Sequence, residues 1–482
     1  MPLDRRSLLT ALAATPFAQA SPPIESDTPL SRDAIVEDVA LLREAYGALH
    51  PGLLRYNDPA TLEAGYAALT APGPSDLAGF YLRLSRFLTT IRCGHTYANF
   101  YNQRAPVARA LFEGPDRVPL RFVWLGSRMI VTGDPLGLGV SPGDEVISLN
   151  GAPVGQVLAA LMTVARADGG NDAKRRQLMS VGGDDAFETF DVFYPLIFGA
   201  RSRHDLVIEG KDGRRRRLLA PAMTLTQRRA QRPPQIDKAH DTPAWTMRRE
   251  KDAAILTMPG WALYGSAWDW RAWLDARMDE LVAENVARLV IDLRGNEGGL
   301  DCGDAIIARL IEAPVRQNDM QRLVRYRKIP DGLRPHLDTW DRAFDDWGDD
   351  AQPYDDRFFT LARRASEGAV IQPKGPRYRG EVRVLIGPQN SSATFLFAQL
   401  ARREKLARLY GEPTGGNRRG INGGAFYFLR LPRTGIEVDL PLIGYFPRTQ
   451  EPDAGIAPDV LVPRRRETIA AGVDPALMAA LG

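Results

Sequence analysis

The chain has few of the residues that build metal sites and disulfide frameworks. Its 482 residues include only two cysteines and five histidines. Two cysteines cannot form a disulfide framework, and no Cys or His residues have the short spacing of a metal-ligating motif. We therefore expect no metal and no other cofactor.

The sequence also lacks a strong charge of one sign and long apolar runs. The formal net charge is +3 and is dispersed, which argues against nucleic-acid binding. Beyond the N-terminus, no apolar run approaches the length of a membrane span. The hydrophobic fraction of 44% is ordinary for a soluble globular protein. The length of the chain exceeds what one hydrophobic core usually supports, so we expect two or three domains.

Residues 1–20 have the features of an export signal. Arg5 and Arg6 are followed by a short apolar run that ends in small residues at Ala20. This pattern is typical of a twin-arginine signal peptide, and an ordinary amphipathic helix is the alternative interpretation. Twin-arginine signals export folded proteins. We therefore expect a periplasmic or secreted protein that begins near Ser21 and has no stable membrane span after cleavage.

Two serines stand at a predicted turn between a strand and a helix. An apolar strand over Val382–Ile386 leads to Ser391 and Ser392, and an apolar helix begins at Ala393. A hydroxyl at this turn is exposed, and the first N–H groups of the helix can hold an anion beside it. A nucleophilic serine requires this arrangement. Alternatively, one of the serines merely caps the helix, which is the commoner role.

Three further segments carry candidate site residues. A predicted buried strand over Leu289–Leu293 ends in a loop that contains Gly298 and Gly299. Glycines allow backbone N–H groups to converge on a developing negative charge, although most glycine-rich loops make only tight turns. His95 follows a helical segment, and the segment 451–460 lies close to the C-terminus.

These segments together resemble peptidase family S41, which includes C-terminal-processing proteases and the tricorn core protease. The resemblance covers most of residues 30–463. Its motifs are GHT at 94–96, IDLRGNEGG at 291–299, SSATF at 391–395, FAQLA at 397–401, GEPTGG at 411–416 and GIAPD at 455–459. It implies an α/β fold, with a crotonase/ClpP-like S41 core, a helical N-terminal region and an inserted β-rich, PDZ-like domain.

The resemblance and the composition predict a division into domains. Short strands and glycine turns precede the core, and their VSPGDEVISLNGAP stretch resembles a PDZ module, which binds a peptide as an added strand. A β-rich spacer without a ligand is the alternative. The alternation of strand, helix and strand over 253–293 predicts a largely parallel sheet. The predicted units are the signal peptide (1–20), the helical region with the histidine (25–110), the PDZ-like domain (115–222), the core (240–465) and a tail (466–482).

Within the core, residues 315–378 are rich in Arg, Asp and Trp. Because this stretch follows the glycine loop, we expect an insertion that lines or covers the cleft. A plain surface excursion is the alternative.

The absence of one lysine separates two branches of the family. One branch uses a Ser-Lys dyad whose lysine follows the GEPT-like turn. Here the corresponding position, 25 residues after Ser392, is Asn417, followed by Arg418 and Arg419. Arginine cannot act as a general base because it stays protonated in proteins. The GHT motif resembles the tricorn-like branch, which has a Ser-His-Glu arrangement. The resemblance therefore implies that His95 is the general base.

The resemblance also implies the nucleophile and the oxyanion donors. Ser392 is the expected nucleophile because its SATF segment aligns with the SA-x-E pattern of relatives, and Ser391 is the competing candidate. The expected oxyanion donors are backbone N–H groups near Gly298, Gly299 and Ala393. Two positions depart from the family pattern: Phe395 stands where relatives often have Glu, and Cys93 stands where Asp is common.

The acid that orients the imidazole is the least defined member of the site. Glu451 is our candidate because it immediately precedes the closing motif, but the local register differs by one residue from the family pattern. Asp453 and Glu437 therefore remain alternatives. Arg418 and Arg419 are candidates for binding a substrate carboxylate, and exposure at the surface is the alternative for both.

Both cysteines flank predicted site loops. Cys93 lies two residues before His95, and Cys302 follows the glycine loop. If the two loops meet at one site, a disulfide in the exported protein would join them. Two buried free thiols are the alternative.

The predicted function is an exported serine peptidase that acts on peptides or unfolded protein through an acyl-enzyme intermediate. One alternative is a non-catalytic ligand- or peptide-binding protein on the same fold. An esterase-like hydrolase is another, although the chain lacks the G-x-S-x-G motif of α/β-hydrolases. The sequence leaves the oligomeric state open.

Overall fold

The computed structural model describes residues 25–73, 75–185, 187–232, 241–317, 319–361 and 370–482. The predicted export signal, residues 1–20, lies outside the described residues.

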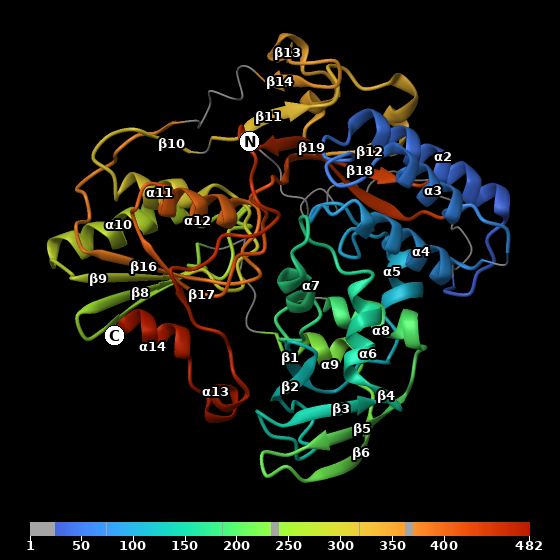
Figure 1. The fold of residues 1–482 in the computed structure, drawn as a ribbon, viewed down its shortest axis with the longest axis horizontal. Helices are drawn as coiled ribbons and strands as arrows, with labels where there is room; N and C mark the ends of the chain where they lie inside the picture. The colour runs from blue at the N-terminus through green and yellow to red at the C-terminus, as the bar shows by residue number, and fades with distance from the viewer. Residues whose placement is uncertain (1–24, 74, 186, 233–240, 318, 362–369) are drawn as a thin grey trace.

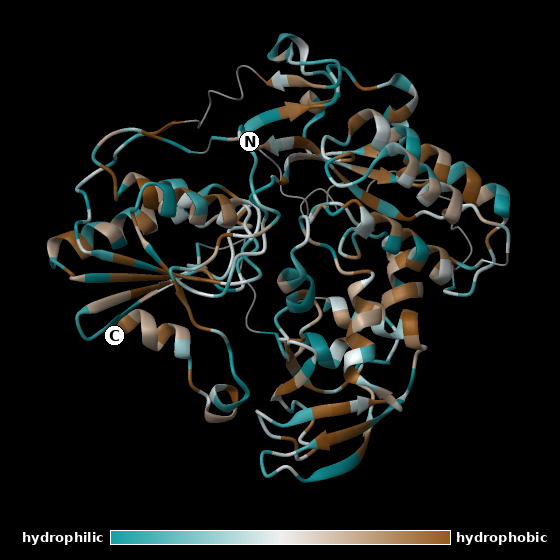
Figure 2. Ribbon diagram, viewed as in Figure 1, coloured by the Kyte–Doolittle hydropathy of each residue, from teal (hydrophilic) through white to brown (hydrophobic). Residues whose placement is uncertain are grey.

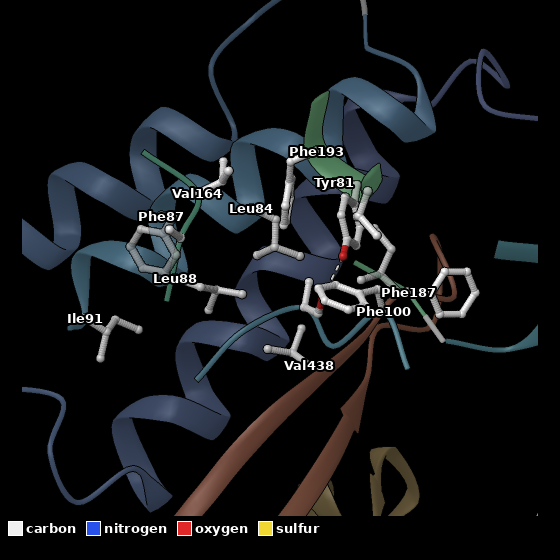
Figure 3. Packing of buried hydrophobic residues seen from close by; sticks show 14 of the residues in the cluster. Tyr81, Leu84, Phe87, Leu88, Ile91, Phe100, Val164, Phe187, Phe193 and Val438 are labelled. Atoms are coloured by element: carbon white, nitrogen blue, oxygen red, sulfur yellow. Dashed lines mark hydrogen bonds between the residues drawn. The ribbon is translucent and has the colours of Figure 1, made fainter. Parts of the chain in front are cut away.

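Four helices form the N-terminal region, as the predicted fold class requires. Three of them begin at a residue whose side chain accepts a hydrogen bond from a first-turn N–H group, namely Ser31, Asp58 and Asp76. Figure 3 shows buried residues of this region, including Tyr81 and Leu84, above Val438 of a later strand. The helices are α2 (Arg32–Leu49), α3 (Pro59–Leu69), α4 (Leu77–Thr90) and α5 (Ala105–Phe112).

A mainly antiparallel β-rich part follows, with strand order β1-β2-β3-β5-β6 and β4 beside β3. Helix α8 joins this part to the N-terminal helices, since the ring of Phe193 stacks 6.1 Å from that of Tyr81 in α4. The strands are β1 (Arg121–Leu125), β2 (Arg128–Gly133), β3 (Glu145–Leu149), β4 (Ala152–Pro153), β5 (Arg203–Glu209) and β6 (Arg215–Pro221). The helices are α6 (Val154–Met162), α7 (Asp172–Leu178), α8 (Thr189–Phe198) and α9 (Leu225–Arg229).

The second sheet, which is largely parallel, has the strand order β20-β17-β16-β9-β8-β7, and only the edge strand β7 is antiparallel to its neighbour. The predicted strand–helix–strand crossover is therefore confirmed. The strands are β7 (Thr246–Glu250), β8 (Ala253–Thr257), β9 (Arg288–Asp292), β16 (Glu381–Ile386), β17 (Arg408–Gly411) and β20 (Val460–Leu461). The helices around the sheet are α10 (Trp270–Ala283), α11 (Cys302–Ala308), α12 (Ala393–Arg403), α13 (Arg466–Ala471) and α14 (Pro475–Leu481).

Both faces of this sheet are buried, which explains why its strands are almost continuously apolar. Ile291 and Val384 pack in the cluster with α10, α11 and α12, whereas Val290 and Leu385 pack with α14 on the opposite face. Figure 1 shows α10–α12 on one side of the sheet and α14 on the other, and Figure 2 shows the apolar strands between them.

Within the segment 315–378, which was predicted to be an insertion, the described residues build a further sheet with the later hairpin of β18 and β19. The strand order is β12-β18-β19-β11-β14-β13, and β10 pairs separately with β15. The strands are β10 (Val315–Arg316), β11 (Gln321–Val324), β12 (Leu337–Asp338), β13 (Ala351–Pro353), β14 (Phe359–Leu361), β15 (Val370–Ile371), β18 (Asn422–Arg430) and β19 (Glu437–Phe446). Three 3₁₀ turns connect them: η1 (Asp331–His336), η2 (Arg342–Asp345) and η3 (Gly348–Asp350).

The two cysteines do not form the hypothesised disulfide in this structure. Both are buried free thiols. Cys93 packs in the cluster of the N-terminal helices, whereas Cys302 packs in that of the parallel sheet. In the part of the chain that the structure describes, no helix is both long and apolar enough to cross a bilayer. Within the same residues, no group of His, Cys, Asp and Glu side chains is placed to hold a metal ion.

Candidate active site

Ser392 has an unusual backbone conformation at the turn between β16 and α12. Its φ is 53° and its ψ is −128°, and its side chain makes no capping hydrogen bond to the helix. Residues other than glycine rarely adopt positive φ, and such strain costs on the order of 1–3 kcal/mol. The side chain is half-buried. The capping interpretation of Ser392 is therefore wrong, and the hydroxyl is held at a strained turn.

The glycine loop after β9 packs directly against this turn. A Cβ atom on Gly298 would lie 2.8 Å from the carbonyl oxygen of Ser391, 2.9 Å from the nitrogen of Ala393 and 3.0 Å from the Cβ of Ser392. Ala393 is the first residue of α12, so its N–H group has no acceptor within the helix. The three residues expected to supply oxyanion donors thus lie together around Ser392, with Gly299 adjoining Gly298.

One of the expected donors is already engaged. The N–H group of Gly298 donates to Oδ1 of Asn296 at 2.9 Å. The side-chain amide of Asn296 in turn donates to the carbonyl oxygen of Met258 at 2.9 Å. Met258 directly follows β8, so this bond anchors the loop to the end of that strand. The loop is therefore held by its own hydrogen bonds, and the N–H group of Gly298 is occupied by one of them.

His95 lies in a turn that follows α4 and faces the β18–β19 hairpin. A Cβ atom on Gly423 would lie 3.8 Å from Cε1 of His95, and the imidazole and the ring of Phe426 are 5.5 Å apart. His95 and Ser391 line one cavity of about 140 Å³. The turn at His95, the turn at Ser391 and the hairpin therefore enclose the same space, and Ser392 itself is not among the described residues that line it.

A buried network supports the histidine turn. The N–H group of Gly52 donates to Nδ1 of His50 at 3.1 Å, so Nε2 of His50 carries the proton and donates to the hydroxyl of Thr96 at 2.8 Å. Burial, with a smaller effect of the charge on Arg55, lowers the pKa of His50 to about 3. His50 is thus a neutral structural histidine, and it fixes the residue next to His95.

The three predicted acids occupy different positions. Glu451 forms an ion pair with Arg418 at 2.6 Å, and Asp453 accepts hydrogen bonds from Gly170 at 2.8 Å and Asn417 at 2.6 Å. Glu437 pairs with Arg430 at 3.2 Å, and burial raises its pKa to about 7.

None of these three acids is among the described residues that line the cavity with His95; the acidic residues there are Asp168, Glu297 and Asp439. Asp439 is buried in β19 and accepts hydrogen bonds from Asn99 at 2.8 Å and Asn102 at 3.1 Å. Its own N–H group donates to the carbonyl oxygen of Tyr97, two residues after His95, at 3.1 Å. The sequence signal was a second carboxylate, two residues after Glu437, at the start of the apolar run of β19.

The residues after the GEPTGG motif are engaged with the protein itself. Asn417, at the position of the lysine in the other branch, is fully buried and donates to the carbonyl oxygen of Asp168 at 3.1 Å as well as to Asp453. Arg418 pairs with Glu451, and the guanidinium of Arg419 lies 5.6 Å from the ring of Tyr56.

Three charged residues of the cavity were not expected from the sequence. Lys174 places its Nζ 2.6 Å from Oε1 of Glu297 and 3.4 Å from the hydroxyl of Ser391, and Arg166 lies 3.1 Å from Oε2 of Glu297. Burial opposes ionisation of Glu297, but the two cations lower its pKa to about 2. Burial lowers the pKa of Lys174, against the attraction of Glu297. Both cations come from the β-rich part, where no motif marks them.

The chain is similar to known proteins in part of its sequence and in its fold. Residues 252–462 match the family model described as Peptidase family S41. Mature CPAF complexed with lactacystin is 15% identical, with a TM-score of 0.62 and 91% of this chain and 95% of that chain covered. Mature CPAF alone is 16% identical, with a TM-score of 0.61 and 91% and 94% covered. The tricorn protease is 14% identical, with a TM-score of 0.35 and 92% and 36% covered. No curated protein matches the chain.

The family match covers the parallel sheet from β8 onward and the turn at Ser392, and the CPAF structures share the fold over most of the chain. Residues 252–462 are therefore similar to peptidase family S41. The predicted α/β fold class is confirmed. At this level of identity the likeness to CPAF establishes the fold alone, and a peptidase acting on peptide substrates is what the family indicates.

Proposed function

We propose that the protein is an exported serine peptidase in which Ser392 is the nucleophile and His95 is the general base. The observation that carries this proposal is the strained conformation of Ser392 at a strand–helix turn, with no capping bond to account for it. Strain of this kind persists where the surrounding structure enforces it, and it concentrates at active sites.

The proposed reaction is acyl transfer. His95 takes the proton of the Ser392 hydroxyl as its oxygen attacks the scissile carbonyl carbon. The N–H group of Ala393, assisted by backbone at Gly299, stabilises the oxyanion. His95 then protonates the leaving amine, which leaves an acyl group on Ser392. A water molecule, activated by the same imidazole, hydrolyses this ester and regenerates the enzyme.

The proposed acid is Asp439 rather than Glu451. Asp439 lines the cavity with His95 and is tied to the histidine turn through Tyr97 and Asn99. Glu451 is instead paired with Arg418. An acid beside the imidazole holds it in the correct tautomer and stabilises its protonated form.

The substrate class and the location are parts of the same proposal. The family and the β-rich part, which resembles a peptide-binding module, support peptides or unfolded protein as substrates. The N-terminal sequence supports export to the periplasm or the exterior. A binding protein on this fold would have no use for a strained, uncapped serine, and an esterase remains distinguishable by its substrates.

A fluorophosphonate serine probe tests the proposal. We expect wild-type protein to be labelled, Ser391→Ala to retain labelling, and both Ser392→Ala and His95→Ala to lose it. Absence of labelling in the wild type together with no peptide hydrolysis would overturn the peptidase proposal. Hydrolysis of small esters without hydrolysis of peptides would replace the peptidase by the esterase.

A further inference from the structure

A single carboxylate joins the three loops of the candidate active site. Glu297 immediately precedes Gly298 in the oxyanion loop and binds both Lys174 and Arg166. Nζ of Lys174 also lies 3.2 Å from the carbonyl oxygen of Gln389 and 3.4 Å from the hydroxyl of Ser391, both in the nucleophile turn.

Arg166 extends the same connection to the histidine turn. Its Nη1 donates to the carbonyl oxygen of Gly94, the residue before His95, at 2.9 Å, and its guanidinium lies 4.5 Å from the ring of Tyr97. The two cations and Glu297 thus contact the oxyanion loop, the nucleophile turn and the histidine turn together.

Because the Lys174 side chain is buried and that of Arg166 is largely buried, their pairing with Glu297 matters for the stability of the site. The Lys174 side chain is 1% exposed and that of Arg166 is 17% exposed, whereas Glu297 retains 38%. A buried ammonium is costly unless it is paired and hydrogen-bonded, and breaking such a pair is far more costly than replacing both partners. The Lys174 ammonium reaches three oxygen atoms, which matches its three donors.

The charge of Glu297 also bears on catalysis directly. A carboxylate next to the oxyanion loop would oppose the negative charge that develops there, unless cations neutralise it. Lys174 and Arg166 supply two positive charges at this carboxylate, and both come from residues outside the segment that matches the S41 family model.

We propose that Lys174, Glu297 and Arg166 are positioning residues. They hold the three loops of the candidate site in their relative positions, and the two cations neutralise the carboxylate of Glu297 beside the oxyanion loop. This inference rests on the proposed serine peptidase mechanism. A misplacement of catalytic groups by about 1 Å can cost about 100-fold in rate. The β-rich part therefore supplies part of the active-site scaffold, in addition to any role in binding peptide.

The test compares kcat and KM for a peptide substrate, the rate of fluorophosphonate labelling and the melting temperature. We expect Lys174→Met to lower kcat and the labelling rate by about 10- to 100-fold, with little change in KM. Glu297→Gln should lower both rates less, because it also removes the opposing charge. The double variant Lys174→Met/Glu297→Gln should lose no more than Lys174→Met alone, because the two residues act through one interaction.

Asp172→Asn is the matched control on the same helix. Asp172 pairs with Arg175 at 2.8 Å, and its side chain is 60% exposed and away from the cavity lining. It should label and turn over at the wild-type rates.

Wild-type rates in a folded Lys174→Met or Glu297→Gln variant would overturn the positioning role while leaving the peptidase proposal in place. Losses that simply add in the double variant would also overturn it. If a single variant does not fold, the double variant, which removes both charges of the buried pair, decides the question: wild-type rates in it would overturn the positioning role. An unlabelled, inactive wild type would overturn the peptidase proposal itself.

Discussion

The backbone of Ser392 is the feature at the scale of single residues on which the proposed chemistry depends. Its positive φ is enforced by strand β16 on one side and helix α12 on the other, while the loop at Gly298 packs against its Cβ. The hydroxyl is thereby held in place before any substrate binds. Such pre-organisation contributes to the rate because no rearrangement is needed during the reaction.

Relieving the backbone strain at Ser392 should raise the stability of the protein without restoring activity. Ser392→Ala keeps the strained conformation, whereas Ser392→Gly relieves it, since glycine adopts positive φ readily. We expect both variants to be inactive and the glycine variant to be more stable than the alanine variant by about 1 kcal/mol in urea unfolding. Ser391→Gly is the control because Ser391 does not have positive φ. Equal stability of the two Ser392 variants would contradict the strain argument.

The choice between Asp439 and Glu451 can be made by amide substitution. Asp439→Asn should lower kcat by about 1,000-fold or more, because the imidazole loses the charge that stabilises its protonated form. Glu451→Gln should retain activity within a few-fold, since it removes only an ion pair with Arg418 that is partly exposed. Kinetics on peptide substrates, with melting curves as the control for folding, measure both. The reverse order of losses would restore Glu451 as the orienting acid.

His50 should make stability depend on pH. Its pKa is about 3 in the folded protein and ordinarily 6.5, so the unfolded chain binds the extra proton first as the pH falls. The contribution of neutral His50 to the free energy of unfolding is therefore fully present above pH 6.5. It is lost progressively toward pH 3, at up to about 1.4 kcal/mol per pH unit. Urea unfolding of His50→Gln should show a shallower decline over this range than wild type. Parallel curves would contradict the assignment.

At the scale of elements, the site depends on how closely the oxyanion loop approaches the nucleophile turn. Only glycine fits at residue 298, because any Cβ atom there would meet the backbone of Ser391 and Ala393 within 2.9 Å. The two turns belong to adjacent parallel strands, β9 and β16, whose carboxyl ends meet at one edge of the sheet. The parallel sheet thus brings the two loops together, and the glycine permits their contact.

Gly298→Ala should therefore disrupt the site more than a glycine substitution nearby. We expect a loss of about 100-fold in kcat, because the added methyl group displaces the oxyanion donors. Gly295→Ala is the matched control: Gly295 also has positive φ, but its Cβ would approach only the side chain of Gln389, at 3.6 Å. Peptide kinetics and melting curves distinguish the two. Equal losses would mean that backbone strain, rather than the contact with Ser392, is responsible.

At the scale of the whole molecule, the active site lies where three parts of the chain share surfaces. The hairpin of β18 and β19 belongs to the segment that matches the family model, but its apolar residues pack with the N-terminal helices. Asp439 on this hairpin is hydrogen-bonded to Asn99, and Lys174 of the β-rich part reaches Glu297 of the parallel sheet. The regions predicted as separate domains are therefore interdependent at the site.

A fragment of residues 244–482 should consequently fail to fold on its own. Without residues 25–232, it would expose apolar side chains of the hairpin that pack with the N-terminal helices in the intact chain, including Val438. We expect this fragment to aggregate or bind a hydrophobic dye such as ANS, and to show no cooperative unfolding by circular dichroism. The intact mature chain is the control. Cooperative unfolding of the fragment would contradict the shared core.

Some elements were predictable because their signals are local. The strands around Leu289 and Val384 are continuous apolar runs of the length expected for strands buried on both faces. The strands of residues 315–378 were missed because they are only two to four residues long. Two of them, β11 and β12, pair directly with the distant hairpin, and such pairing leaves no periodic pattern in a short strand.

The sequence by itself determined the α/β class, the parallel core and the turn that holds Ser392, because apolar runs, glycines and helix starts act over a few neighbouring residues. Only the tertiary structure decided which charges surround that turn. Lys174 and Glu297 are 123 positions apart, and Asn99 and Asp439 are 340 apart. Interactions over such separations depend on the packing of whole elements, and no local pattern of residues encodes them.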